Sequence, residues 1–359
     1  MAQQKYVKVG GVWKPVTAEY GKIGGAWKPA VTNYAKIGGD WKPVPFEKFV
    51  FVCEDISSRL YAVDDTPAVV TGWPKYGSDG HGETISGVND VACGKSSRSY
   101  FACDNGVYQV EKDGTITWRY DMTAGYSVNC VVTDADGNVY AADGAGLLVK
   151  LDDSGGLLWS HAFAPNIVYS LVVDYAGGYV YAGIGTSEKA IYRCLISNGA
   201  TSRALTVTGY GTPTGLAIVS GVPDLLVGTA SGFVFRWNAS AGYVWGAGAP
   251  LGSGAGVESV RYGHDGYVYA SNASGSVYKL AYTNGTAAWV HTGTGCAAGL
   301  SVDLSGNVYA AWYVAGSSTT NNCVRKLSKL GALLWTWRPY LNAQMLSVAV
   351  TPGIKSAGF

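Results

Sequence analysis

Charged residues are scarce in this chain, and no long apolar segment is present. Asp, Glu, Lys and Arg account for 14% of the 359 residues, and 26 basic residues nearly balance 25 acidic ones. A net charge of +1 provides little attraction for nucleic acid or for an anionic membrane, so neither is expected as a partner. No apolar run approaches the roughly 18 residues that would span a bilayer. The N-terminus, MAQQKYVKVGG, also lacks the apolar core of a signal peptide, and we expect a protein made in, and released from, a cytoplasm.

Motifs that carry chemistry are also missing. The sequence has no GxSxG, HExxH or P-loop pattern, and its seven cysteines form no CxxC pair. The segment 134–138 begins like a calcium loop but lacks the later glutamate, which favours a hairpin turn. We therefore predict no enzyme, no metal site and no cofactor, and we interpret the cysteines as buried thiols. The four histidines lie in different repeats or loops, at His81, His161, His264 and His291.

Glycine and tyrosine, in contrast, are abundant. The chain has 50 Gly and 25 Tyr, which suits many short strands joined by tight turns. The segment 131–159, VVTDADGNVYAADGAGLLVKLDDSGGLLW, contains four short apolar runs separated by turns rich in Asp and Gly. Four antiparallel strands in sequence form one small sheet that is apolar on both faces. Such a sheet needs similar neighbours on both sides.

The chain supplies those neighbours as a repeat. The spacing runs from 39 residues, between positions 101 and 140, to 50 residues, between positions 51 and 101. A period in the forties with four strands per repeat is typical of a β-propeller blade. The second strands of the seven copies are marked by Phe51-Val52, Tyr100-Phe101, Val139-Tyr140, Val180-Tyr181, Leu226-Val227, Val268-Tyr269 and Val308-Tyr309. The fourth strands carry Trp73, Trp118, Trp159, Trp245, Trp289 and Trp335, and the fourth copy has Ala204-Leu205 instead.

The two ends of the repeat array complement each other. The first copy has candidate second, third and fourth strands at 49–53, 59–63 and 69–73, but no first strand precedes them. The last copy is followed by 345–351, MLSVAVT, which resembles the first strands of other copies. We predict that this terminal strand completes blade one and removes an exposed sheet edge. The sequence thus predicts an all-β fold in which residues 46–359 form a seven-bladed β-propeller closed by the C-terminal strand.

Four segments between the third and fourth strands carry a family resemblance. They end in a glycine turn followed by an apolar pair and Trp, and read QVEKDGTITW, KLDDSGGLLW, RWNASAGYVW and KLSKLGALLW. This pattern resembles the repeat of pyrroloquinoline-quinone-type (PQQ-like) propellers over residues 49–351. The resemblance implies the architecture and leaves function open, because the same repeat serves cofactor-dependent dehydrogenases and scaffolds without a cofactor. The chain lacks the adjacent cysteine pair of the quinone-dependent dehydrogenases.

A second, shorter repeat occupies residues 1–45. The segments YVKVGGVWKPV, YGKIGGAWKPA and YAKIGGDWKPV recur every 14 residues, and each Gly-Gly pair suits a two-residue hairpin turn. Pairing across the first turn sets Val9 opposite Val12, Lys8 opposite Trp13 and Tyr6 opposite Pro15. The sequence therefore predicts three short β-hairpins that present Lys and Trp on one face.

These hairpins have almost no interior, and isolated hairpins are marginal in water. Two interpretations remain open: the array packs on its own propeller, or it anchors the chain to a multimeric particle. The repeats resemble those of virion structural proteins of tailed bacteriophages, which implies other virion proteins as partners. The predicted anchor residues are Tyr6, Lys8, Trp13, Tyr20, Lys22, Trp27, Tyr34, Lys36 and Trp41.

Two loops are candidate ligand-binding sites on the propeller. The polar segment 76–90 contains His81, and an insertion at 312–322, WYVAGSSTTNN, interrupts the seventh copy. Aromatic and amide side chains suit sugars, through ring stacking and hydrogen bonds to hydroxyls. The candidate residues in the insertion are Trp312, Tyr313, Asn321 and Asn322, and the other interpretation is an ordinary solvated turn.

Together these patterns favour a bacteriophage virion protein. Its hairpins would anchor it, as one of several identical copies, in a tail, fibre or decoration assembly, and its ring would be displayed to bind a host glycan or a protein receptor. The chain would be made in the host cytoplasm and reside in the virion. One alternative is an intracellular bacterial scaffold for protein–protein interaction. An enzyme is the least supported interpretation, because no acid–base or cofactor constellation emerges.

Overall fold

The computed structural model divides the chain into two compact units, Met1–Lys48 and Phe49–Phe359. The predicted boundary lies three residues earlier, between positions 45 and 46. The described residues are 48–54, 58–77, 84–207, 209–219, 224–246, 251–252, 254–314, 322–339 and 344–351, without the side chain of Ser96, together with the backbone of the strands between 6 and 44.

The first unit consists of three hairpins in the predicted register. In the first, Lys8 pairs with Trp13 and Tyr6 with Pro15, and the equivalent Lys–Trp pairs recur in the other two. The first and third hairpins join into one four-stranded sheet, and the second stands as a two-stranded sheet. The strands are β1 (Tyr6–Val9), β2 (Val12–Pro15), β3 (Tyr20–Ile23), β4 (Ala26–Pro29), β5 (Asn33–Ile37) and β6 (Asp40–Val44).

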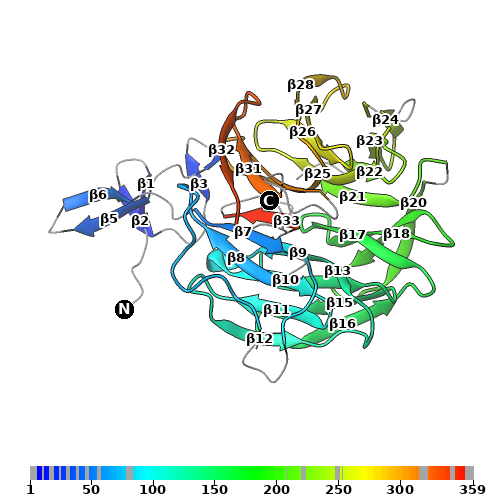
Figure 1. Cartoon of the computed structure of the whole chain (residues 1–359), viewed down its shortest axis with the longest axis horizontal. Helices are drawn as coiled ribbons and strands as arrows, with labels where there is room; N and C mark the ends of the chain where they lie inside the picture. The colour runs from blue at the N-terminus through cyan, green and yellow to red at the C-terminus, as the bar shows by residue number, and fades with distance from the viewer. Residues whose placement is uncertain are drawn as a thin grey trace. The chain divides into compact units, whose positions relative to one another are not determined.

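The second unit is a ring of seven small antiparallel sheets, which confirms the predicted seven-bladed propeller (Figure 1). The first, innermost strands of blades one to seven are β33 (Met345–Val350), β9 (Val88–Cys93), β13 (Val128–Thr133), β17 (Ile167–Asp174), β21 (Pro213–Ile218), β25 (Val257–Tyr262) and β29 (Cys296–Val302). The second strands are β7 (Val50–Glu54), β10 (Ser99–Cys103), β14 (Val139–Asp143), β18 (Tyr179–Gly185), β22 (Asp224–Thr229), β26 (Tyr267–Asn272) and β30 (Val308–Tyr313).

The outer half of each blade is formed by the third and fourth strands. The third strands are β8 (Arg59–Val63), β11 (Gly106–Val110), β15 (Leu147–Leu151), β19 (Ala190–Leu195), β23 (Val234–Asn238), β27 (Ser276–Ala281) and β31 (Cys323–Leu327). The fourth strands of blades two to seven are β12 (Ile116–Tyr120), β16 (Leu157–Ala162), β20 (Thr201–Thr206), β24 (Gly242–Trp245), β28 (Ala287–Thr292) and β32 (Leu333–Trp337). A single 3-10 turn, η1 (Lys95–Ser97), is the only helical element among the described residues.

The C-terminal strand closes the ring as predicted. Strand β33 pairs antiparallel with β7, with Val348 opposite Val52 and Ala349 opposite Phe51, and the two strands lie side by side in Figure 1. Each innermost strand contacts the innermost strand of the next blade, and β33 contacts both β29 and β9. The circle is therefore continuous across the two ends of the propeller.

Blade one differs from the prediction at its outer edge. The expected fourth strand at 69–73 is reduced to two isolated bridges, Val63 with Val69 and Leu60 with Lys75. Pro67 and Pro74 lie on either side of this segment, and proline has no amide hydrogen to extend a ladder. Blade one therefore has three regular strands, one from the C-terminus and two from the start of the ring.

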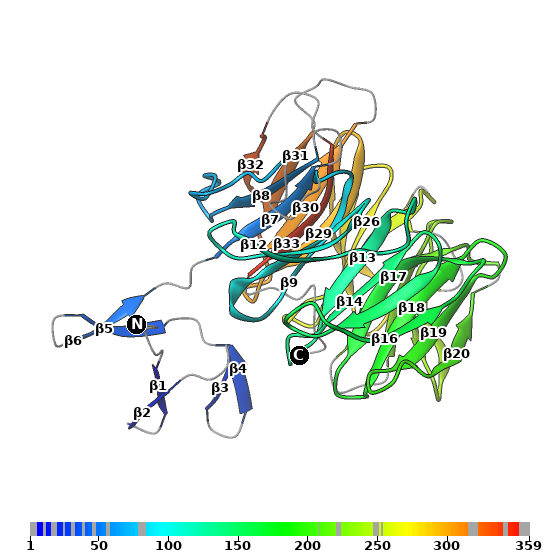
Figure 2. The same ribbon diagram turned by 90° about the horizontal axis from the view of Figure 1, so that it is seen from below.

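The blades stack face to face, as Figure 2 shows for blades three and four, and the fourth-strand tryptophans join neighbours. The indole of Trp159 donates through Nε1 to the Ile196 carbonyl of the next blade at 2.9 Å, and Trp118 donates to the Asp153 carbonyl at 3.1 Å. The receiving turns contain glycine at the contact, because a Cβ at Gly199 would lie 2.7 Å from the Trp159 ring. Trp335 faces the incomplete edge of blade one, and its buried Nε1 has no hydrogen-bond partner among the described residues.

We expect Val348→Asp to open the ring. Val348 is fully buried in the closing strand, so the substitution places an unpaired carboxylate in an apolar contact and should lower the free energy of unfolding by at least about 3 kcal/mol. The control Leu330→Asp changes a side chain that is 78% exposed in an outer turn. Urea unfolding monitored by tryptophan fluorescence measures both, and equal stabilities would contradict closure through β33.

The tryptophan hydrogen bonds predict a second, paired result. Trp159→Phe and Trp335→Phe both replace a half-buried indole by a smaller ring, but only Trp159 donates a hydrogen bond to the next blade. We expect Trp159→Phe to cost about 1 kcal/mol more than Trp335→Phe in the same unfolding assay. An equal cost for the two would mean that the indole N–H contributes nothing to blade stacking.

Candidate functional site at the ring axis

Each innermost strand carries a β-bulge at the same place in the repeat. The ladder between the first and second strands skips one residue of the first strand there, and two in blade seven. A bulge breaks the alternation of side chains and turns the extra residue away from the ladder. The bulged residues of blades two to seven, and then of blade one, are Asn89, Asn129, Tyr169, Thr214, Glu258, Ala298 and Leu346, of which Ala298 shares its bulge with Gly299.

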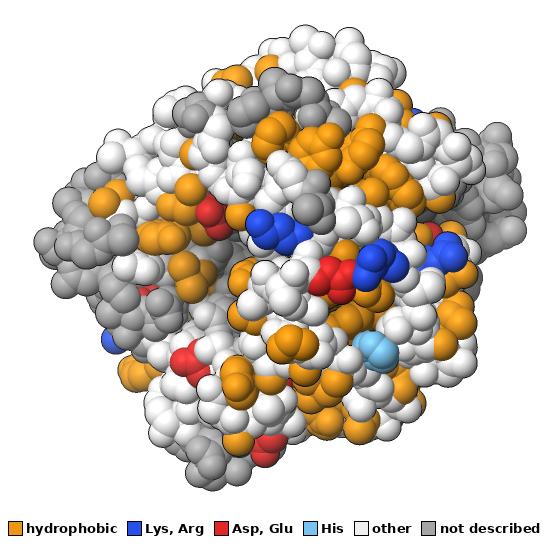
Figure 3. All heavy atoms as spheres, turned by 90° about the vertical axis from the view of Figure 1, so that its right-hand side faces the viewer, with side chains coloured by type: hydrophobic (Ala, Val, Ile, Leu, Met, Phe, Trp, Pro, Cys, Tyr) orange, Lys and Arg blue, Asp and Glu red, His pale blue; other side chains and the backbone are white. Residues whose placement is uncertain are grey.

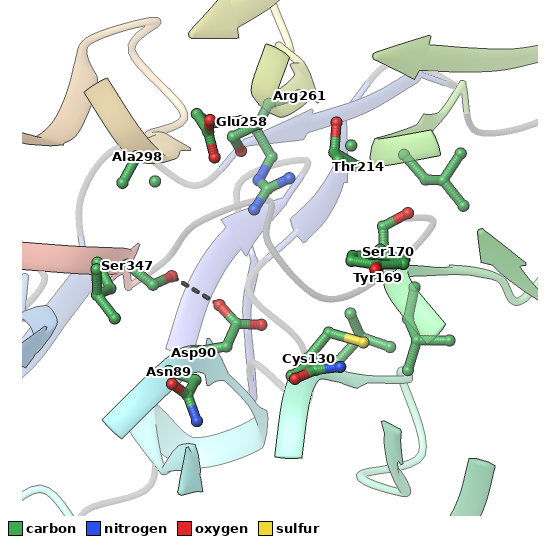
Figure 4. Close-up of a pocket in the computed structure, with 18 of the residues that line it drawn as sticks. Asn89, Asp90, Cys130, Tyr169, Ser170, Thr214, Glu258, Arg261, Ala298 and Ser347 are labelled. Carbon is green, nitrogen blue, oxygen red and sulfur yellow. Dashed lines mark hydrogen bonds between the residues drawn. The ribbon is translucent and has the colours of Figure 1, made fainter. Parts of the chain in front are cut away.

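All seven bulged residues line one pocket on the axis of the ring. The pocket has a volume of about 300 Å³, and every blade contributes to its wall. Figure 4 shows the side chains converging from different strands, with the Arg261 guanidinium reaching into the middle and the Asp90 carboxylate across from it. The bulges thus convert the inner ends of seven sheets into a single polar cavity.

Several of the lining side chains hold the blades together. Asn89 donates through Nδ2 to the Val128 carbonyl of blade three at 3.2 Å, and Asn129 donates to the Val168 carbonyl of blade four at 3.1 Å. In the same direction around the ring, Thr214 donates to the Val257 carbonyl. These hydrogen bonds cross from one blade to the next, so these side chains have a structural role.

The closing seam is joined in the same region. The Ser347 hydroxyl of blade one donates to Oδ1 of Asp90 in blade two at 2.7 Å, and Oδ2 of Asp90 accepts the Val131 amide of blade three at 3.0 Å. Gly299 of blade seven lies so close to β33 that a Cβ there would be 2.7 Å from the Ser347 Cα. The Asp90 carboxylate of blade two therefore links blades one, two and three across the seam.

Strand β25 supplies three polar groups without such partners. Among the described residues, Nε of Arg261 and Oγ of Ser259 are buried without a hydrogen-bond partner, and the Glu258 carboxylate, which is exposed toward the pocket, forms no hydrogen bond or ion pair. The guanidinium of Arg261 makes one hydrogen bond, from Nη1 to the adjacent Val260 carbonyl at 2.7 Å. Burial raises the pKa of Glu258, and burial lowers the pKa of Arg261 against the opposing effect of the Asp90 charge. Unsatisfied buried groups are costly, and they collect here on one wall of the pocket.

Two residues predicted as ligand contacts in the insertion of blade seven have other roles, and positions 315–321 of that insertion lie outside the described residues. Trp312 is fully buried in β30, where its Nε1 donates to the Gly275 carbonyl at 3.3 Å and the Arg325 guanidinium lies 4.7 Å over its ring. Asn322 is also buried, and its Oδ1 accepts the Val314 amide at 2.7 Å. The prediction that these two residues contact a ligand is wrong. Trp312 is packed in the core, and Asn322 is engaged by a backbone hydrogen bond. Tyr313, the last residue of β30, lines the axial pocket.

Other predicted site residues lie outside the part of the chain whose side chains are described. This applies to His81 and Asn321 in the ring, and to all nine predicted anchor residues of the hairpins, whose backbone register alone is given. Within the described residues, no group of three His, Cys, Asp or Glu side chains is placed to hold a metal ion. In the same part of the chain, no helix is long and apolar enough to cross a membrane.

The candidate calcium loop of blade three is a hairpin turn. Oδ1 of Asp134 accepts the amides of Asp136 and Asn138 at 3.0 and 2.9 Å. Oδ2 accepts the Tyr140 hydroxyl at 2.9 Å. The carboxylate is thereby committed to the turn and to the second strand of its own blade.

The ring defines a class: this is a seven-bladed β-propeller, and residues 104–205 match a family of PQQ-like propeller repeats. The family described as "Outer membrane protein assembly factor BamB" matches residues 104–205, which reach from blade two to the fourth strand of blade four. The match does not extend to the N-terminal hairpins. No curated protein matches the chain.

Solved structures share the fold at low sequence identity. A streptogramin B lyase structure aligns with a TM-score of 0.62 and 13% identity, covering 73% of this chain and 86% of that one. A chain of the mitotic checkpoint complex gives 0.60 and 15%, covering 73% and 82%. A protein of unknown function from Bacteroides caccae gives 0.50 and 11%, covering 85% and 98%. At these identities the likeness concerns the fold alone.

The raised pKa of Glu258 predicts a pH-dependent effect of Glu258→Gln. The folded protein holds the carboxyl proton more tightly than the unfolded chain, so the native carboxylate reduces stability as pH rises above its ordinary pKa. We expect Glu258→Gln to be more stable than the wild type at pH 7, with the difference vanishing below about pH 4. Thermal unfolding across pH 4 to 8 measures this.

Asp152→Asn is a control of opposite sign. The pKa of Asp152 is lowered, chiefly by the hydrogen bond from the Ser154 hydroxyl, so its carboxylate favours the folded state above its ordinary pKa. We expect Asp152→Asn to lose stability at pH 7 and to match the wild type in acid. A loss of stability at pH 7 in both variants would contradict the account of Glu258.

Proposed function

We propose that this chain is a structural protein of a bacteriophage virion. Its N-terminal hairpins anchor it, in several copies, to other proteins of a tail, fibre or decoration assembly, and its ring is displayed to bind a host-surface glycan or receptor. It is made in the host cytoplasm and resides in the particle. The observation that carries the proposal is a separate unit of three hairpins that place Lys and Trp in the same register three times.

The register supports an interaction role for the hairpins. Directly paired residues lie on one face of a hairpin, so Lys8 and Trp13 share a face, as do Lys22 with Trp27. Tryptophan is the residue most enriched among those that dominate binding energy in protein interfaces. A repeated Trp face on a unit of two small sheets suits a repetitive partner such as an oligomeric particle.

The ring is better suited to ligand binding than to catalysis. Its seven sheets form a rigid circle, and the bulged first strands gather side chains from every blade into one axial pocket. Pockets that collect polar groups from a fixed scaffold are the usual form of a small-ligand site. A display protein needs such a recognition surface and no turnover.

An intracellular scaffold for protein–protein interaction is the second candidate. Leu157 and Leu158 of β16, and Leu333 and Leu334 of β32, are each about half exposed on the outer strands. The face in Figure 3 likewise carries hydrophobic side chains among uncharged polar ones, with few charges between them. Apolar groups on exposed edges mark places where other proteins dock.

The anchor is tested in the full-length chain with two triple variants. Replacing Trp13, Trp27 and Trp41 by Ala removes the proposed anchor face, and we expect incorporation into phage particles to fall at least about tenfold. The matched control replaces the adjacent residues Lys14, Lys28 and Lys42 by Ala, which lie on the opposite face of each hairpin. Quantitative immunoblotting of purified particles measures both.

The outcomes separate the two candidates. Unchanged incorporation of the tryptophan variant, or an equal loss in the lysine control, would overturn the anchor proposal. A full-length chain that stays monomeric, is absent from particles and co-purifies with host proteins would favour the scaffold.

A further inference from the structure

We infer that the axial pocket binds one uncharged monosaccharide unit, the terminal sugar of a glycan, between the polar wall of β25 and the tyrosines that line the cavity. The inference rests on the proposed display function and gives its ligand a chemical class and a place. It comes from four features of the pocket: its size, its polar donors and acceptors, its mixed charge and its tyrosines.

The size of the pocket selects a small ligand. Its volume of about 300 Å³ is at the lower end of the range for small-molecule sites. That space suits one sugar ring with a few water molecules and excludes a folded peptide segment. The remainder of a glycan would extend out of the pocket, so a chain end is the part that enters.

The polar groups match the two-sided hydrogen bonding of a sugar. The Arg261 guanidinium reaches into the pocket and makes one hydrogen bond, to the adjacent Val260 carbonyl, and the exposed Glu258 carboxylate lines the same wall. A sugar hydroxyl donates one hydrogen bond and accepts others, so neighbouring hydroxyls can satisfy both kinds of group at once.

The charges of the wall disfavour ions. Glu258 and Asp90 would repel a carboxylate or phosphate, and Arg261 would repel a cation. A zwitterionic amino acid would find one of the two carboxylates already engaged, because the Asp90 oxygens accept the Ser347 hydroxyl and the Val131 amide. Burial raises the pKa of Glu258, which weakens it further as an ammonium partner. An uncharged polyhydroxylated ligand meets none of these obstacles.

Aromatic side chains provide the apolar part of the site. Tyr169, the bulged residue of blade four, is 39% exposed and lines the pocket, and Tyr313 of blade seven lines it as well. The C–H face of a pyranose ring packs on the face of an aromatic ring. A sugar in the pocket would therefore have an apolar contact in addition to the polar groups of β25.

The test is a titration of the full-length chain with single methyl glycosides. Glucose, galactose, mannose, rhamnose and N-acetylglucosamine glycosides are the uncharged probes, and glucuronate, glucosamine and glycine are the charged ones. Isothermal calorimetry and saturation-transfer NMR report binding. We expect at least one uncharged glycoside to bind with a Kd of about 1 mM, the affinity that typical ligand efficiency allows for so small a ligand, and the charged probes to bind at least about tenfold more weakly.

Substitutions locate the binding. Ala298→Phe fills the pocket without removing a polar group, and we expect it to abolish binding. Ala241→Phe makes the same change in an exposed turn of blade five and should bind like the wild type. Arg261→Lys keeps the charge but loses the Nε donor, and we expect at least a tenfold loss. Circular dichroism establishes that each variant is folded.

Three results would overturn the inference: no uncharged glycoside binds the folded wild type, the charged probes bind as well or better, or Ala298→Phe and Ala241→Phe behave alike. These outcomes are distinct from a failure of the proposed function. A chain that enters particles through its tryptophans but binds no sugar would contradict the inference alone. A chain that binds a sugar but is absent from particles would contradict the virion role alone.

Discussion

The ring depends on the burial of small sheets against one another. Each blade has few strands and apolar side chains on both faces, so a single blade could not exclude water from its core. Stacking supplies a neighbour to every face only if the row closes on itself. Pairing of β33 with β7 provides that closure, and it joins the last strand of the propeller to the first through an uninterrupted ladder apart from one bulge.

Closure also explains why the pocket lies on the axis. Innermost strands from seven blades converge there, and their close approach requires glycine at positions such as Gly215, where a Cβ would be 2.9 Å from the Val260 amide of the next blade. Bulges turn one side chain per blade away from this crowded contact. Some of these side chains, such as Asn89 and Asn129, link neighbouring blades, whereas the Glu258 carboxylate forms no hydrogen bond with the described residues. The pocket therefore combines a structural ring with a few groups that stability does not require.

The fold could be predicted from the sequence because the residues that recur in each repeat are the ones that form the core and the contacts between blades. The hydrophobic pair of the second strand and the tryptophan of the fourth occur where the core and the blade contacts need them, and the hairpin register followed from the Gly-Gly turns. The axial site is not predicted from sequence because the bulged residues precede the apolar core of each first strand, as Asn89 precedes Val91 and Tyr169 precedes Leu171. A bulge breaks the two-residue alternation from which strands are recognised. One signal was available: a chemically variable position followed by a small residue, two positions before the apolar start of each first strand.

The errors at Trp312 and Asn322 have a related cause. Aromatic and amide residues beside a long insertion were interpreted by their chemistry, but their positions in the repeat decide their environment. Trp312 lies three residues after the marked pair Val308-Tyr309 and is buried beneath the Arg325 guanidinium, while Asn322 accepts a backbone amide next to β31. Tyr313, one residue further along, has the opposite orientation in an alternating strand and reaches the axial pocket. In a repeat protein, therefore, the position of a residue within its repeat is better evidence for a site than the residue type alone.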